Sequence, residues 1–246
     1  MFRLSLALAK AKFKLRNEGS YFGIIWYLLN PMFFFLLLFF IFNDRIGGGI
    51  EKYPLFLLIG VILFSFFQSC TIESTRTISE NRGIIRSIKF KQESLILANI
   101  LNYLFSHIFE ILIFTVFLII FRINLIGLLF YPIILIFFCL FIYGISLALS
   151  AIIVYFPDLG DIWNFLTKLL WFATPIFYEI GGQTRLFFLN LFNPLYYFLT
   201  LTRDILIYNK IPELWIIIGA TEYTLISLVI GIIIFKKLKK KFAEKI

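Results

Sequence analysis

Long apolar stretches, separated by short polar and charged connections, fill most of the sequence. Six of them approach or exceed the ~20 residues that a helix needs to cross a hydrocarbon core about 30 Å thick. They lie at 23–42, 55–72, 95–121, 128–154, 159–177 and 214–235. The fifth is the weakest, because it is short and contains Lys168. The pattern predicts an all-α integral membrane protein with six transmembrane helices.

The connection between the fifth and sixth stretches is itself partly apolar. It contains two short apolar pieces, 186–192 and 195–201, split by Asn193 and Pro194. Neither is long enough to cross a membrane. The pattern fits a re-entrant hairpin packed against protein and equally an amphipathic loop on the outer surface.

The first sixteen residues combine five basic side chains with apolar ones. The segment from Lys10 to Arg16 alternates like a strand, but its place before an apolar stretch favours a basic helix in the membrane interface. The domain organisation we expect is an interfacial basic helix at 1–20, a transmembrane domain at 21–238 and a basic tail at 239–246.

Basic residues are distributed unevenly between the two sets of connections. Five precede the first stretch, five lie between the second and third, and six follow the last, whereas the alternate connections carry six in all. Lys and Arg resist translocation. We therefore expect both termini to be cytoplasmic, in the cytoplasmic (inner) membrane.

Composition supports this picture and excludes a soluble enzyme. Hydrophobic residues make up 61% of the 246, and the mean hydropathy is +0.95. The net charge of +9 lies beside apolar stretches, which fits anionic lipid headgroups better than nucleic acid.

Recognisable sites for nucleotide or metal are missing from the sequence. It contains no GxxxxGK[ST] stretch to hold ATP phosphates, so energy from ATP requires a partner. With His107 as the lone histidine and no Cys, His and acid cluster, we expect no metal site, no cofactor on this chain and no catalytic residue.

Four ionisable residues fall inside the apolar stretches, where charge is costly: His107, Glu110, Lys168 and Glu222. They form either a polar strip along a conduit or polar contacts between helices, and their scatter favours the second. His107 and Glu110 are three residues apart on one helical face and can satisfy each other. Asn99 and Asn102 extend the polar pattern of that stretch, which predicts a face turned toward protein or water.

Several motifs, in order along nearly the whole chain, resemble the permease subunits of type-2 ABC exporters, specifically those for polysaccharides and polyol phosphates such as O-antigen, capsule or teichoic acid. The motifs are Lys14-Leu-Arg-Asn-Glu-Gly-Ser-Tyr-Phe-Gly-Ile-Ile-Trp-Tyr-Leu-Leu-Asn-Pro31, Tyr53-Pro-Leu-Phe-Leu-Leu-Ile-Gly60, Val154-Tyr-Phe-Pro-Asp158, Thr174-Pro-Ile-Phe-Tyr178 and Asn193-Pro-Leu195 followed by Arg203-Asp204. Pro157 stands where the family has Arg, and Asp158 is expected to cap the next helix. The resemblance favours the re-entrant hairpin, on the extracellular side.

The stretch Glu80-Asn-Arg-Gly-Ile-Ile-Arg-Ser-Ile-Lys-Phe90 resembles the family's coupling helix, which docks into the ATPase subunit. Lys91-Gln92 replaces the usual Pro-Arg, while Glu93 remains. The coupling residues implied by the resemblance are Glu80, Asn81, Arg82, Ile84, Ile85, Arg86, Ile88, Phe90 and Glu93.

The function that the resemblance implies is export of a polyprenyl-pyrophosphate-linked polysaccharide. The partners would be a second copy of the chain, two ATP-binding subunits that hold ATP and Mg²⁺, the glycan substrate and membrane lipids. The alternatives are a drug or small-lipid exporter of the same family, and a secondary transporter or channel independent of ATP. The candidates for binding the pyrophosphate are Arg3, Lys10, Lys14 and Arg16.

Overall fold

The computed structural model describes residues 2–18, 25–45, 47–87, 90–181, 183–239 and 242, and all regular structure in these ranges is helical. The helices are α1 (Phe2–Asn17), α2 (Ile25–Phe42), a 3-10 turn η1 (Gly47–Gly49), α3 (Tyr53–Glu80), α4 (Arg82–Ser87), α5 (Glu93–Ile120), α6 (Gly127–Ile152), α7 (Leu159–Ala173), α8 (Thr184–Leu191), α9 (Pro194–Leu206) and α10 (Leu214–Leu238).

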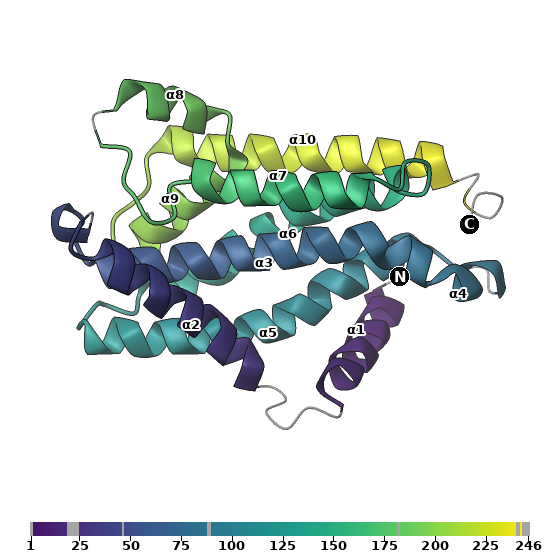
Figure 1. The fold of residues 1–246 in the computed structure, drawn as a ribbon, viewed down its shortest axis with the longest axis horizontal. Coiled ribbons are helices and arrows are strands. Elements are labelled where there is room, and N and C mark those ends of the chain that lie inside the picture. Colours follow the sequence, from purple (N-terminus) through teal and green to yellow (C-terminus); the bar gives the residue numbers. More distant parts are fainter. Residues whose placement is uncertain are drawn as a thin grey trace.

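The long helices form an elongated bundle with two distinct ends (Figure 1). α3, α6, α7 and α10 run along the long axis, and α2 crosses this direction obliquely. α1, α4 and the end of α10 lie near one end, whereas α8 and the end of α9 lie at the other. The segments predicted to be basic and cytoplasmic are thus on one end of the molecule.

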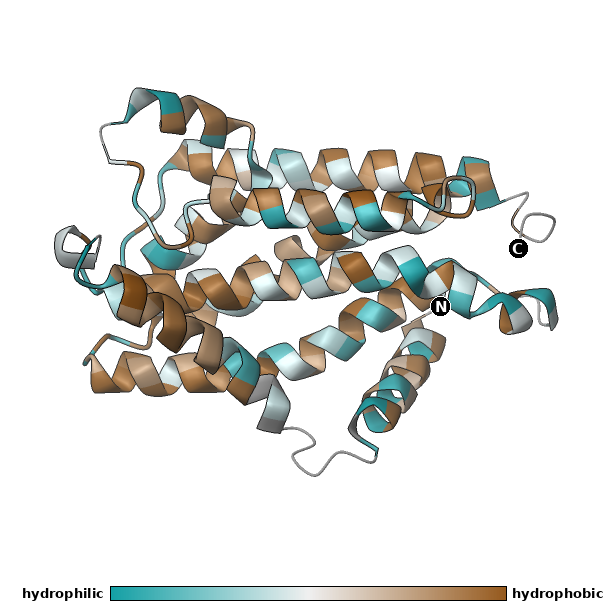
Figure 2. Cartoon of the chain, viewed as in Figure 1, coloured by the Kyte–Doolittle hydropathy of each residue, from teal (hydrophilic) through white to brown (hydrophobic). Residues whose placement is uncertain are grey.

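Four helices in the described ranges are long and apolar enough to cross a membrane: α3, α5, α6 and α10. α2 contributes a shorter apolar segment, Leu29–Phe42, and α7 has fifteen residues. At 1.5 Å per residue, α7 is about 22 Å long. Hydrophobic residues dominate the middle of the bundle and polar ones gather at its ends and connections (Figure 2).

The core is built around α3. This helix contacts α2, α5, α6, α7 and α9, and its first half is buried almost without interruption. Phe64 and Phe67 of α3 meet the rings of Trp171 and Phe141 at centroid distances of 4.8 and 6.1 Å. Aromatic packing therefore joins α3 to α6 and to α7, and α3 and α7 carry part of the site described below.

α6 and α10 pack most closely at two glycines. A Cβ on Gly231 would overlap the carbonyl oxygen of Gly144, and a Cβ on Gly144 would overlap the backbone of Ser227. Small residues at such positions let two helix backbones approach each other.

One helix start is capped by a side chain, and one predicted cap is absent. The Asn193 side chain accepts a hydrogen bond from the backbone N–H of Leu195 and caps α9, with Pro194 in its first turn. The prediction that Asp158 caps α7 is wrong: Asp158 precedes the helix, but its backbone is already helical and its side chain makes no capping hydrogen bond.

Candidate functional site

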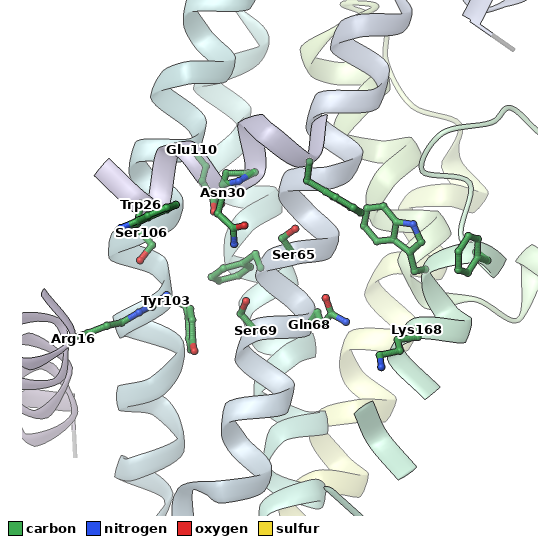
Figure 3. A pocket seen from close by; sticks show the side chains of 15 residues that line it. Arg16, Trp26, Asn30, Ser65, Gln68, Ser69, Tyr103, Ser106, Glu110 and Lys168 are labelled. Atoms are coloured by element: carbon green, nitrogen blue, oxygen red, sulfur yellow. The ribbon is translucent and has the colours of Figure 1, made fainter. Parts of the chain in front are cut away.

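A polar cleft of ≈ 610 Å³ opens between α2, α3, α5 and α7, with the last turn of α1 beside it (Figure 3). Its walls carry charged, amide, hydroxyl and aromatic side chains. The lining residues are Arg16, Trp26, Asn30, Pro31, Phe34, Ser65, Phe66, Gln68, Ser69, Tyr103, Ser106, Glu110, Lys168, Trp171 and Phe172.

Helical spacing explains why the cleft is polar inside an apolar bundle. Ser65, Gln68 and Ser69 are three and four residues apart and lie on one face of α3. Tyr103, Ser106 and Glu110 repeat this spacing on α5. Two polar stripes on otherwise apolar helices thus face the same space (Figure 3). Of the face predicted for the third stretch, Glu110 lines the cleft, whereas Asn99, Asn102 and His107 are buried within the protein.

Two cations and one carboxylate contribute charge to the cleft. Arg16 places its guanidinium carbon 4.8 Å from the ring centroid of Tyr103, where the ring face attracts the cation. Lys168 is exposed on α7, and Glu110 projects from α5. The formal balance is positive, so the cleft favours anionic ligands.

Glu110 is held by a buried hydrogen-bonded group. His107 places Nδ1 3.0 Å from the Glu110 carboxylate and Nε2 2.6 Å from the Tyr131 hydroxyl on α6. The expectation that His107 and Glu110 satisfy each other is confirmed. The group joins α5 to α6 and fixes the carboxylate at the cleft wall.

Polar groups on the cleft walls differ in their hydrogen bonds: one joins two helices, and another has no partner among the described residues. Gln68 donates to the Thr167 hydroxyl at 3.3 Å, which links α3 to α7. The buried hydroxyl of Ser106 has no hydrogen-bond partner among the described residues. Buried hydroxyls normally have a partner, so this one is an exception on the cleft wall.

The four candidates for binding the pyrophosphate lie at different places in the structure. Arg16 lines the cleft, whereas Arg3 and Lys14 are exposed outside its lining. Lys10 borders a separate, largely apolar depression with Phe105. Of the four, Arg16 is therefore the candidate that shares the site with Glu110 and Lys168.

Lys12 takes part in a polar cluster that anchors α1 to the bundle. Its ammonium donates to the Asn99 side chain at 2.6 Å and lies 3.5 Å from Glu73. The Asn99 amide in turn donates to the Thr77 hydroxyl. This positions the end of α1, and so Arg16, against α5.

Glu222, the remaining intramembrane candidate, is exposed on α10 and does not line the cleft. Sequence reasoning missed Asn30, Ser65, Gln68 and Ser69. For the three residues of α3 a signal was present, because they repeat at helical spacing within an apolar run.

The predicted coupling segment spans the end of α3, the short helix α4 and the start of α5. Ile84 is 43% exposed, with Arg82 and Arg86 also exposed, whereas Ile85 is buried against Ile78 and Leu95 of the chain itself. Ile88 lies outside the described residues.

Other members of the coupling segment bind within the chain. The Asn81 amide donates to the Thr77 carbonyl at 2.8 Å, and Phe90 packs beside the cluster of Ile85. Glu93 pairs with Lys239 at 2.6 Å, which joins the start of α5 to the end of α10. Glu80, by contrast, is exposed. Among the described residues, the predicted coupling residues that are exposed are therefore Glu80, Arg82, Ile84 and Arg86.

Comparison with known proteins gives a consistent result over the whole chain. A family model described as "ABC-2 type transporter" matches residues 3–207. An O-antigen export system permease protein RfbA of Klebsiella pneumoniae is 28% identical over 99% of this chain and 95% of its own length. A protein of the same name from Myxococcus xanthus is 23% identical, with the same coverage of both chains.

Proposed function

The chain belongs to the ABC-2 type transporter family, and from this membership we propose that it is the permease subunit of an ATP-driven exporter of lipid-linked polysaccharide. Its family and its four long apolar helices make it a multi-pass membrane protein and a transporter permease, not an enzyme. The substrate class is proposed because both relatives named above, similar over nearly their full length, are called O-antigen export permeases.

The observation that carries the proposal is the polar cleft within the apolar bundle. A polyprenyl pyrophosphate brings at least two negative charges that cannot enter hydrocarbon without partners. Arg16 and Lys168 supply opposite charge in one cleft, and a guanidinium binds phosphate oxygens bidentately. Ser65, Gln68 and Ser69 add hydrogen-bonding groups suited to phosphate or sugar oxygens.

The proposal includes an arrangement in the membrane. We expect α2 and α7 to complete six crossings with the four long helices, with both termini and α4 cytoplasmic. α8 and α9 would form the re-entrant hairpin on the extracellular side. The excess of basic residues at the end that carries α1, α4 and the C-terminus supports this orientation.

The proposed assembly contains two copies of this chain and two ATP-binding subunits that hold ATP and Mg²⁺. α4 would receive the motion of the ATP-binding subunits through its exposed face. Apolar side chains exposed on α2 and α7 suit a contact with the second copy or with lipid. The largest exposures are those of Phe33, Phe40, Phe165 and Phe172.

The test is ATP hydrolysis by the chain reconstituted with its ATP-binding partner in liposomes. We expect an undecaprenyl-pyrophosphate-linked oligosaccharide to stimulate hydrolysis, and undecaprenyl phosphate without sugar to stimulate it less. The chain without its partner should hydrolyse no ATP. Stimulation by small amphiphilic drugs but not by the glycolipid would replace the proposal with a drug or small-lipid exporter.

A further inference from the structure

A second cavity, of ≈ 340 Å³, lies at the end of the bundle away from α4. It is formed by α9, by the first turn of α10 and by the segment that follows α7. None of its residues lines the cleft described above. Any ligand it holds would therefore be bound at a separate site.

One wall of this cavity is aromatic. Trp215 stacks on Tyr196 at a centroid distance of 6.2 Å and an interplanar angle of 30°, and Phe187 meets it edge-on at 6.0 Å. Trp215 keeps 37% of its surface exposed. Neighbouring rings thus fix the indole while leaving part of it available, and a fixed aromatic surface binds the apolar C–H face of a flat ligand at low entropic cost.

The polar rim favours hydroxyl groups over phosphate. Glu179, Asp204 and Glu213 outnumber Arg203 and Lys210, and Lys210 is already paired with Asp204 at 3.1 Å. Glu213 accepts a hydrogen bond from the indole N–H of Trp215. Exposed carboxylates beside an aromatic wall repel anions and accept hydrogen bonds from hydroxyls.

Two phenols complete the rim. Tyr178 donates to the carbonyls of Phe172 and Ala173 at 3.2 and 3.1 Å, and Tyr208 to that of Glu51 at 3.4 Å. Burial raises the pKa of Tyr178 and of Tyr208. Both phenols therefore stay neutral at physiological pH.

The floor of the cavity is rigid. The buried guanidinium of Arg203 donates to the carbonyls of Pro175, Ile176 and Phe56 at 2.7, 2.9 and 3.1 Å. It also lies 3.3 Å from the ring centroid of Phe56. Its Nε has no partner among the described residues. These bonds join α9 to α3 and to the segment that follows α7, so the cavity is organised before a ligand arrives.

We propose that this second cavity is a binding site for uncharged sugar residues of the exported glycan, with Trp215 as the stacking platform and Glu213 as a hydroxyl acceptor. The proposal rests on the proposed function for the class of substrate. It adds a site at the end of the bundle remote from the pyrophosphate candidates, which would hold the sugar chain while the lipid head lies elsewhere.

The experiment measures binding to the chain assembled with its ATP-binding partner in phospholipid nanodiscs free of sugar-headed detergent. The probe is a soluble oligosaccharide, free of lipid and phosphate, released by mild acid from the surface polysaccharide of the source organism. Saturation-transfer NMR and tryptophan fluorescence report its binding. We expect Trp215→Ala to weaken binding about tenfold and Trp215→Phe to restore most of it. The control, Phe130→Ala, removes an exposed ring of α6 that lines neither cavity, and it should bind as wild type does.

Equal affinity of wild type and Trp215→Ala would overturn the site, as would no binding at millimolar probe. Competition by inorganic pyrophosphate or by phospholipid headgroups would overturn it too, because the cavity would then take an anion or a lipid. Glycolipid-stimulated ATP hydrolysis, measured on the same nanodiscs, tests the proposed function separately. If the sugar site fails one of these tests while the glycolipid still stimulates hydrolysis, the proposed function stands without the sugar site.

Discussion

Arg16 lines the polar cleft from the last turn of α1, with its guanidinium over Tyr103. The Lys12 cluster holds the same helix against α5 and so fixes where Arg16 can lie. The role of Arg16 therefore depends on guanidinium geometry as well as on charge.

Arg16→Lys keeps the charge but loses the planar, bidentate donor and the stacking on Tyr103. We expect normal expression and assembly, with glycolipid-stimulated ATP hydrolysis reduced about tenfold at low substrate. Arg3→Lys, the same change on the same helix outside the cleft, is the matched control. Equal stimulation in both variants would leave Arg16 as a topological anchor only.

The His107 group makes a separate prediction, about stability. Tyr131→Phe removes the partner of a buried histidine nitrogen and should lower the free energy of unfolding by about 1–2 kcal/mol. Glu110→Gln should cost stability through the same histidine, so the double variant should lose less than the two losses added together. Unfolding in nanodiscs measures all three, and strict additivity would show that the residues do not act as one group.

Sequence reasoning reached part of this detail. The pairing of His107 with Glu110 follows from helical spacing, which is local. Tyr131, the second partner of His107, is on another helix, and only the packing of α5 on α6 brings it there. The cleft could not be predicted for the same reason: the polar stripes on α3 and α5 face each other only in the folded bundle, which local spacing does not reveal.

At the level of helices, the apolar stretches of the sequence predict the positions of the long helices but not the residues at which they end. α3 was predicted to end at Ile72, yet it continues to Glu80, with Ser74 and Thr77 donating to the carbonyls one turn earlier. These bonds satisfy the hydroxyls within the helix, and α3 continues through polar residues beyond the end of the apolar run. α7 ends at Ala173, before the predicted residue 177, because Thr174 precedes Pro175 and takes an extended conformation.

The close contact between α6 and α10 predicts that two Gly→Ala substitutions differ in their effect on stability. Gly231→Ala would place its Cβ against the Gly144 carbonyl, and separation of the helices should cost about 1–3 kcal/mol of stability. Gly160→Ala on α7 meets its nearest neighbour at 3.5 Å and should be neutral or stabilise by up to about 1 kcal/mol. Thermal unfolding compares them, and equal stability would refute the close packing.

Two adjacent isoleucines of α4 differ in burial, so we expect their substitution by Asp to have different effects. Ile84→Asp changes an exposed side chain, so the permease should fold but fail to retain its ATP-binding partner in co-purification. Ile85→Asp buries a charge in the permease's own core and should reduce the folded yield itself. Undiminished assembly of the Ile84→Asp variant would place the docking face elsewhere.

At the level of the whole molecule, the two ends of the bundle differ in chemistry. The end with α1, α4 and the C-terminus is basic, and the end with α8 and the second cavity carries aromatic rings and carboxylates. The polar cleft lies between helices that also pack on α3. This arrangement suits a substrate with an anionic lipid head and a long neutral sugar chain, moved from the basic end to the other.

The most direct measurement is glycan movement itself. Liposomes containing the chain and its ATP-binding partner receive undecaprenyl-pyrophosphate-linked oligosaccharide on the face that carries the ATP-binding subunits. A glycosidase sealed inside then reports arrival of the sugar. We expect cleavage that requires ATP, stops with a non-hydrolysable analogue and falls in the Arg16→Lys variant. Cleavage that proceeds equally without ATP would contradict ATP-driven export of the glycan. Absence of cleavage while ATP hydrolysis continues would also contradict it.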